Sequence, residues 1–162
     1  MSEQTLTERE TPITQGEPAP DFTLLDQDRV EWTLSDQLKK GDVVLCFYPL
    51  SFTGICGTEM KCVSSEMQRW QSEGAQVVGI SCDSFAVQRA WADQSGFTHT
   101  LLSDIHRRVC KAYGLYWPEM NVSSRGTVIV TRGEGGEPVV RWAQARAVGE
   151  AMDLDEVLSH LA

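Results

Sequence analysis

The spacing of apolar residues along the chain predicts alternating strands and helices. The unbroken apolar run from Val43 to Tyr48 is typical of a strand that is buried on both faces. After this strand, apolar residues recur at steps of four and three as far as about Gly74, which is the stripe of an amphipathic helix. The stripe consists of Cys56, Met60, Val63, Met67 and Trp70.

The remaining segments continue this alternation and add a hairpin near each end. Polar residues 26–29 and the glycine-rich residues 133–136 each separate two strand-like segments, so both are expected to be hairpin turns. The strand–helix–strand order between them implies right-handed crossovers and parallel pairing in the middle of the sheet. The expected strands are 21–25, 30–34, 43–48, 76–81, 100–102, 127–131 and 139–142; the expected helices end near 74, 95, 113 and 161, and residues 35–36 are expected to cap a short helical turn before Gly41.

This pattern predicts an α/β thioredoxin-like fold, with a central mixed β-sheet flanked by helices and an N-terminal hairpin. A chain of 162 residues with 41% hydrophobic content can bury one core of useful size, so one domain is expected. Residues 1–15 are polar and lack periodicity, which indicates a flexible leader that carries no core. The domain itself is therefore expected to span residues 16–162.

The charge balance excludes several classes of partner. A net charge of -9, without any long basic cluster, argues against binding to nucleic acid or to an anionic membrane. The first residues lack a basic segment followed by an apolar one, and no apolar run approaches the length of a membrane span. A cytoplasmic protein is expected.

The five cysteines form neither a disulfide framework nor a sequence pattern for zinc. Their number is odd and they contain no C-x-x-C pair. Cys56 differs from the others because it falls at the start of the predicted amphipathic helix. Unpaired N–H groups and the positive end of the helix dipole favour a thiolate there, so Cys56 is a candidate nucleophile.

Four further residues have a chemical reason to support Cys56. Pro49 ends the preceding strand because it has no N–H to donate, and it can shield one side of a pocket. Thr53 lies one helical turn before Cys56, so its hydroxyl is within reach of a thiolate or a substrate oxygen. Glu59 can hold an arginine, and Arg125, just before a strand expected beside the central one, is the candidate.

The motif Pro49-x-x-x-Thr53-x-x-Cys56 resembles the active-site signature of the peroxiredoxins, which are thiol peroxidases of thioredoxin fold. Residues 16–24 resemble the opening of that family, and residues 125–130 resemble its arginine-bearing strand. Within the family, residues 49–56, 91–98, 101–104 and 112–114 are most similar to the alkyl hydroperoxide reductase E type, a group described as one-cysteine peroxiredoxins.

The resemblance implies a role for each residue of the motif. Cys56 would be the peroxidatic cysteine, Thr53 and Arg125 its activators, and Pro49 its shield. The thiolate would attack the O–O bond of a hydroperoxide and become a sulfenic acid, with no metal or organic cofactor. The resemblance also suggests a homodimer.

The thiol that reduces the sulfenic acid is left open by the sequence. Cys62 lies six residues after Cys56, about 9 Å along a regular helix, so a disulfide between them would need unwinding. Cys110 lies on a later helix and faces the same geometric objection. The default is an external thiol: thioredoxin, glutaredoxin or a low-molecular-weight thiol. A two-cysteine enzyme resolved by Cys62 or Cys110 remains the alternative.

Two other functions are compatible with the predicted fold. A thioredoxin-like disulfide oxidoreductase needs a second cysteine close to the first, but Glu59 occupies the position three residues after Cys56. A non-catalytic binding module would keep the fold with an inert cysteine. Reduction of insulin would identify a disulfide oxidoreductase. A Cys56 thiol of ordinary reactivity would identify a non-catalytic module.

Overall fold

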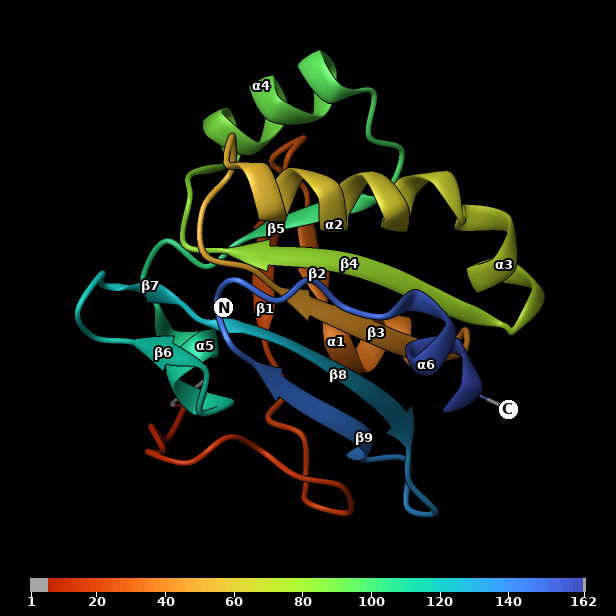
Figure 1. Cartoon of the computed structure of the whole chain (residues 1–162). Coiled ribbons are helices and arrows are strands. Elements are labelled where there is room, and N and C mark those ends of the chain that lie inside the picture. The colour runs from red at the N-terminus through yellow and green to blue at the C-terminus, as the bar shows by residue number, and fades with distance from the viewer. Residues whose placement is uncertain (1–5, 162) are drawn as a thin grey trace.

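The computed structural model describes residues 6–161 and contains a mixed sheet with strand order β2-β1-β5-β4-β3-β8-β9 and helices on both faces (Figure 1). The strands are β1 (Thr23–Asp26), β2 (Glu31–Thr33), β3 (Asp42–Phe47), β4 (Ala75–Ser81), β5 (Thr100–Ser103), β6 (Tyr116–Trp117), β7 (Val122–Ser123), β8 (Arg125–Arg132) and β9 (Pro138–Arg146). The helices are α1 (Leu34–Gln37), α2 (Gly54–Ser65), α3 (Met67–Ser72), α4 (Phe85–Ser95), α5 (Arg108–Ala112) and α6 (Leu154–Ser159).

The pairing of the strands confirms the predicted mixed sheet. Strand β4 runs parallel to both β3 and β5, whereas the β1–β2 and β8–β9 hairpins add antiparallel strands on either side. Because β3 and β8 are antiparallel, the carboxyl end of β3 lies beside the amino end of β8, with Phe47 opposite Gly126. This edge of the sheet is where the chain turns into α2.

The central strand β3 separates two apolar cores, as its unbroken apolar run predicts. Leu45 and Phe47 pack on one face with residues of α1 and α5. Val44 and Cys46 pack on the other face with residues of α2, α3, α4 and α6, and Figure 1 shows α2 and α4 on the same side of the sheet. Burial raises the pKa of the Cys46 thiol, so this cysteine is held in its neutral form.

The predicted helix to Gly74 is interrupted, and this expectation is wrong in one respect. The backbone of Glu66 leaves the helical region (φ -109, ψ 22), so α2 ends at Ser65 and α3 begins at Met67. Trp70 nevertheless stays buried and its indole N–H donates to the Val63 carbonyl at 3.2 Å. The apolar stripe continues across the break, which is why periodicity alone does not reveal it.

Residues 6–15 contact the domain although the sequence predicts that they carry no core. The N–H of Arg9 donates to the Lys111 carbonyl, and that of Ile13 donates to the Tyr113 carbonyl. Ile13 is only 3% exposed and joins the core cluster that includes α5. The prediction is wrong for Ile13 because an irregular segment gains its contacts from a distant element, which leaves no periodic pattern. Residues 1–5 lie outside the described residues.

Within residues 6–161, every helix is too short or too polar to cross a lipid bilayer.

The imidazole of His99 is buried beside the core that packs between the sheet and α2. It is 1% exposed, its ring packs near Phe97, and its Nε2 lies 3.3 Å from the Met60 sulfur. Ser64 Oγ bonds to Nδ1 on the other side. Burial lowers the pKa of His99 from 6.5 to about 4, so the ring is neutral at pH 7.

Because the imidazole of His99 is buried, the free energy of unfolding depends on pH. Above pH 6.5 His99 is neutral in both the folded and the unfolded chain and adds no pH dependence. Between pH 6.5 and about 4 only the unfolded chain binds the proton, so folding weakens by about 2 kcal/mol at pH 5. A His99→Gln variant, unfolded by urea at pH 7 and pH 5, is expected to lose less stability between these values than the parent. Equal losses in the two proteins would contradict this.

Candidate active site

The turn between β3 and α2 places Cys56 at an edge of the sheet. The N–H of Tyr48 makes a last bond to the Ile80 carbonyl at 3.0 Å, and the buried Pro49 then ends the ladder. Phe52 has a positive φ of 64°, a region that non-glycine residues seldom adopt. Thr53 follows in an extended conformation and α2 begins at the next residue.

Cys56 lies in the first turn of α2. The first helical bond runs from the Gly57 N–H to the Thr53 carbonyl at 2.8 Å, so the N–H groups between them belong to the unpaired helix start. The partial positive charge at this end stabilises a nearby anion. Cys56 is 2% exposed, and it lies beside the exposed side chains of Phe52, Thr53 and Ile55. Cys56 is therefore almost completely covered although its neighbours in sequence are exposed.

Arg125 reaches the sulfur from the neighbouring strand. It is the first residue of β8 and, because Gly126 pairs with Phe47, it stands at the edge where β3 turns into α2. Its Nη2 donates to Cys56 Sγ at 3.1 Å, and its Nε donates to the Val148 carbonyl at 3.0 Å. The guanidinium is 2% exposed and is fixed at both ends.

Glu59 forms ion pairs with Arg125 and Arg146, and only Arg125 was predicted from the sequence. Its Oε1 lies 3.3 Å from Arg125 Nη1, and its Oε2 accepts from Arg146 Nη2 at 3.1 Å and from the Met152 N–H at 2.8 Å. Arg146 ends β9 and pairs directly with Arg125 across the hairpin. The expected strand ended at 142, and a β-bulge between Ile129 and Val130 shifts the register, so counting outward from the predicted 133–136 turn would not have paired Arg146 with Arg125.

The charges of this buried group favour an anion at Cys56. Two guanidinium groups, Arg125 and Arg146, surround the single carboxylate of Glu59, and all three side chains are at most 3% exposed. The group therefore carries one uncompensated positive charge in a region from which water is excluded. A thiolate at Cys56 neutralises it and receives a charge-assisted bond from Arg125.

The Thr53 hydroxyl is oriented differently from the sequence expectation. Its Oγ1 donates to the Leu50 carbonyl at 2.7 Å, so its hydrogen points back into the turn instead of toward Cys56. The lone pairs of this oxygen are left to accept a bond. Thr53 is exposed, so an incoming molecule can meet it.

The described structure also locates the remaining cysteines. Cys62 is exposed on α2, which is a continuous helix from Cys56 to this position. Cys82 and Cys110 are buried in the core cluster on the opposite face of the sheet from Cys56. Their sulfurs lie 3.9 Å apart, and Asp104 lies beside them, so these three residues are the group that could hold a metal ion.

Comparison with known proteins gives one matching family model and many similar proteins. The model of the AhpC/TSA family matches residues 15–134. The chain is 36% identical over 140 residues to alkyl hydroperoxide reductase E of Mycobacterium tuberculosis, covering 85% of this chain and 89% of that protein. It is 30% identical over 156 residues to the chloroplastic 2-Cys peroxiredoxin BAS1 of Hordeum vulgare, covering 90% of this chain and 72% of that protein.

The fold is also similar to solved structures. The structure of peroxidoxin BcpB from Mycobacterium tuberculosis superposes with a TM-score of 0.81 at 26% identity, covering 92% of this chain and 96% of that chain. The reduced 2-Cys peroxiredoxin of Plasmodium vivax gives a TM-score of 0.81 at 27% identity, covering 93% of this chain and 81% of that chain.

Proposed function

The chain belongs to the AhpC/TSA family, and we propose that Cys56 is the residue with which it reduces hydroperoxides. The protein is a thiol-dependent peroxidase with a peroxiredoxin fold, so its substrates are a peroxide and a reducing thiol. The observation that carries the assignment of Cys56 is the 3.1 Å contact between its sulfur and the guanidinium of Arg125.

The reaction is a displacement at oxygen. The Cys56 thiolate forms an S–O bond to one peroxide oxygen while the O–O bond breaks, and the second oxygen leaves as water or an alcohol after it takes up a proton. Arg125 stabilises the thiolate before the attack and donates to the peroxide oxygens as negative charge moves onto the leaving oxygen. Glu59 acts as a positioning residue that holds Arg125 in place.

Thr53 and Pro49 complete the proposed site. The Thr53 hydroxyl donates to Leu50, so its role toward substrate is to accept a hydrogen bond from the peroxide hydroxyl. This acceptor is oriented by the same bond. Pro49 is buried just after β3, and its role in the proposed site is to shield the sulfur from the side of the strand.

An external thiol is the reductant that the geometry favours. Cys110 is separated from Cys56 by the sheet, and α2 is regular between Cys56 and Cys62, about 9 Å of helical rise. Resolution by Cys62 requires that this helix unwind, since disulfide sulfurs approach to about 2 Å. The homodimer, the cytoplasmic location and the choice among thioredoxin, glutaredoxin and small thiols stay predictions.

Intact mass spectrometry after one equivalent of hydrogen peroxide tests the proposed reaction. We expect the reduced protein to gain one oxygen atom, and addition of a small thiol to restore its mass. A loss of two hydrogens with a Cys56–Cys62 or Cys56–Cys110 link would instead establish internal resolution. An unchanged mass with the peroxide unconsumed would reject the proposed function.

A Thr53→Val variant tests the acceptor role of the hydroxyl. Valine keeps the branched shape but removes the oxygen, so the second-order rate constant for peroxide is expected to fall about 10- to 100-fold, as for the loss of one hydrogen bond. Thr53→Ser is the matched control and should keep most of the rate. Stopped-flow fluorescence under pseudo-first-order peroxide measures both. A Val variant as fast as the Ser variant would remove Thr53 from the mechanism.

A further inference from the structure

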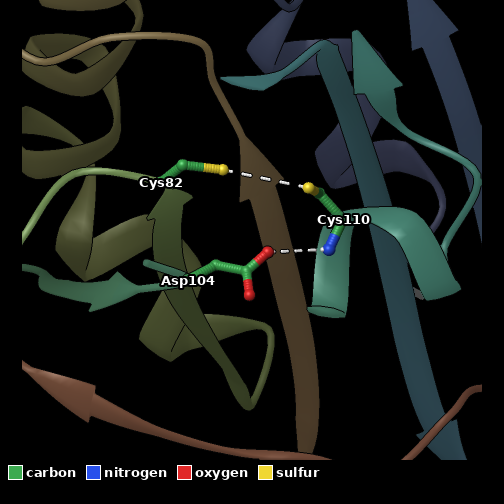
Figure 2. Close-up of side chains that lie close together, drawn as sticks. All are labelled: Cys82, Asp104 and Cys110. Atoms are coloured by element: carbon green, nitrogen blue, oxygen red, sulfur yellow. Dashed lines mark hydrogen bonds between the residues drawn. The ribbon is translucent and has the colours of Figure 1, made fainter. Parts of the chain in front are cut away.

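A second group of reactive side chains lies on the face of the sheet away from Cys56. Cys82 directly follows β4, Asp104 directly follows β5, and Cys110 is in α5. Figure 2 shows the two sulfurs pointing toward each other with the Asp104 carboxylate beneath them. They are 6%, 1% and 0% exposed, in chain order, and one ligand atom from each lies within 4.8 Å of the others.

Packing and helix capping explain only part of this arrangement. Asp104 accepts from the N–H groups of Val109 and Cys110 at 3.1 and 2.8 Å, so its carboxylate caps α5. Two thiols in contact can also pack as small apolar groups. Neither role requires two sulfur donors and a carboxylate to converge on one buried point, and that convergence is what a metal ion needs.

We propose that Cys82, Asp104 and Cys110 bind one zinc ion or another thiophilic divalent ion. Zinc accepts cysteine sulfur at about 2.3 Å and carboxylate oxygen at about 2.0–2.2 Å in tetrahedral geometry. Two sulfurs on one tetrahedral zinc ion are therefore separated by about 3.8 Å. The observed separation is 3.9 Å.

The same distance weighs against a disulfide as the native state of this pair. A disulfide would bring the sulfurs to about 2.05 Å, which requires one of the two buried chains to move. A zinc ion requires almost no change in their separation. The carboxylate also has a function in a zinc site and none in a disulfide.

A fourth ligand, an oxygen, is available from the backbone. The Arg107 carbonyl accepts from the Cys110 thiol at 3.4 Å, at a residue whose φ is 63°. The Arg107 guanidinium donates to the carbonyls of Ile105 and Asn121, which fixes this turn. Together the four groups supply two sulfurs and two oxygens.

Binding is balanced in charge and involves no redox step. Two zinc–sulfur bonds form as the two thiols release their protons, and Asp104 contributes as the carboxylate. The two charges of the ion replace two protons, so the net charge of the buried site does not change. The bound ion would link the end of β4 to α5. Asp83, the residue after Cys82, accepts hydrogen bonds from the N–H and the hydroxyl of Ser51 in the active-site turn. The proposed metal site is therefore connected to that turn.

Cobalt(II) is the probe for the site, because it replaces zinc and its spectrum reports thiolate ligands and tetrahedral geometry. The reduced, metal-stripped full chain carrying Cys56→Ser is titrated, so that the catalytic thiol cannot compete for the ion. We expect one equivalent to bind with thiolate-to-cobalt absorption, about two protons to be released, and zinc to displace the cobalt.

Substitutions of the proposed ligands, with a matched control, show whether the metal ion binds at this site or elsewhere on the protein. Cys82→Ser should weaken binding at least about 100-fold, whereas Cys62→Ser, the exposed cysteine, should leave it unchanged. Cys110→Ala is the second ligand variant if the first does not fold. A rise in the melting temperature of the parent protein when zinc is added would support the site, and this measurement does not depend on any variant.

Three results would overturn the proposal. The first is the absence of thiolate-to-cobalt absorption in the reduced Cys56→Ser protein together with an unchanged melting temperature of the parent in zinc. The second is binding that survives in both ligand variants. The third is a Cys82–Cys110 disulfide, found by non-reducing peptide mapping, in protein that binds no metal after full reduction.

Discussion

A Cys56→Ser variant is expected to lose peroxide reduction almost completely. Serine keeps the shape of the side chain, but its hydroxyl stays protonated and is a poor nucleophile even next to Arg125. The second-order rate constant should fall roughly 10⁴-fold or more, as when other enzymes lose their nucleophile. Peroxide consumption by the reduced protein, followed in a stopped-flow instrument, measures the loss.

Cys62→Ser is the matched control for this variant. Cys62 is on the same helix and is exposed, so a general reaction of accessible thiols with peroxide would depend on it more than on the buried Cys56. We expect its rate constant for peroxide to equal that of the parent. A Cys56→Ser protein that consumes peroxide as fast as the Cys62→Ser protein would contradict the assignment.

Replacement of Arg125 is expected to have the second largest effect. Arg125→Met fills a similar volume but removes the donor at 3.1 Å from the sulfur and the charge that stabilises the thiolate. The rate constant should fall about 10²- to 10³-fold, which is typical for loss of one preorganised donor. Arg125→Lys keeps the charge but cannot contact Cys56, Glu59 and the Val148 carbonyl at once, so it should recover only part of the rate.

Stability provides the second readout for Arg125. Removing one partner of a buried ion pair costs about 3 kcal/mol or more, although Glu59 keeps its bond to Arg146. Arg146→Met removes the other arginine from Glu59 without touching the sulfur. It should lose similar stability but retain more of the rate. Equal rate losses in the two variants would mean that the contact of Arg125 with the sulfur adds nothing to the charge and support that both arginines provide.

Much of the fold follows from periodicity, because the strands and helices bury their apolar sides in a regular way. The continuous apolar run of β3 predicted a strand covered on both faces, and the parallel centre followed from the strand–helix–strand order. The spacing of apolar residues does not reveal a break in a helix when the apolar stripe continues past the break. The break at Glu66 and the packing of Ile13 were therefore not predicted.

The site was predictable where it depended on strand neighbours and not where it depended on register or side-chain direction. Arg125 was expected near Cys56 because its strand was expected beside β3. Arg146 was missed because its place beside Glu59 depends on a hairpin four residues longer than the apolar pattern indicated. The Thr53 hydroxyl bond to Leu50 depends on a turn with an unusual φ at Phe52, which no sequence pattern specifies.

The pairing of Cys82 with Cys110 shows the same limit. The two residues are 28 positions apart, one after a strand and one in a short helix, so their spacing resembles no zinc motif. They meet because β4 and β5 are parallel neighbours and α5 folds back under their carboxyl ends. Such a contact is visible only in the folded chain.

The measurement that tests the central claim most directly is the location of the first oxidised sulfur. The reduced parent is mixed with one equivalent of hydrogen peroxide, denatured in the presence of dimedone, and digested for peptide mass spectrometry. The account predicts a dimedone adduct on Cys56 in most molecules, with the other four cysteines recovered as free thiols. An adduct on any other cysteine, with Cys56 still a free thiol, would contradict it.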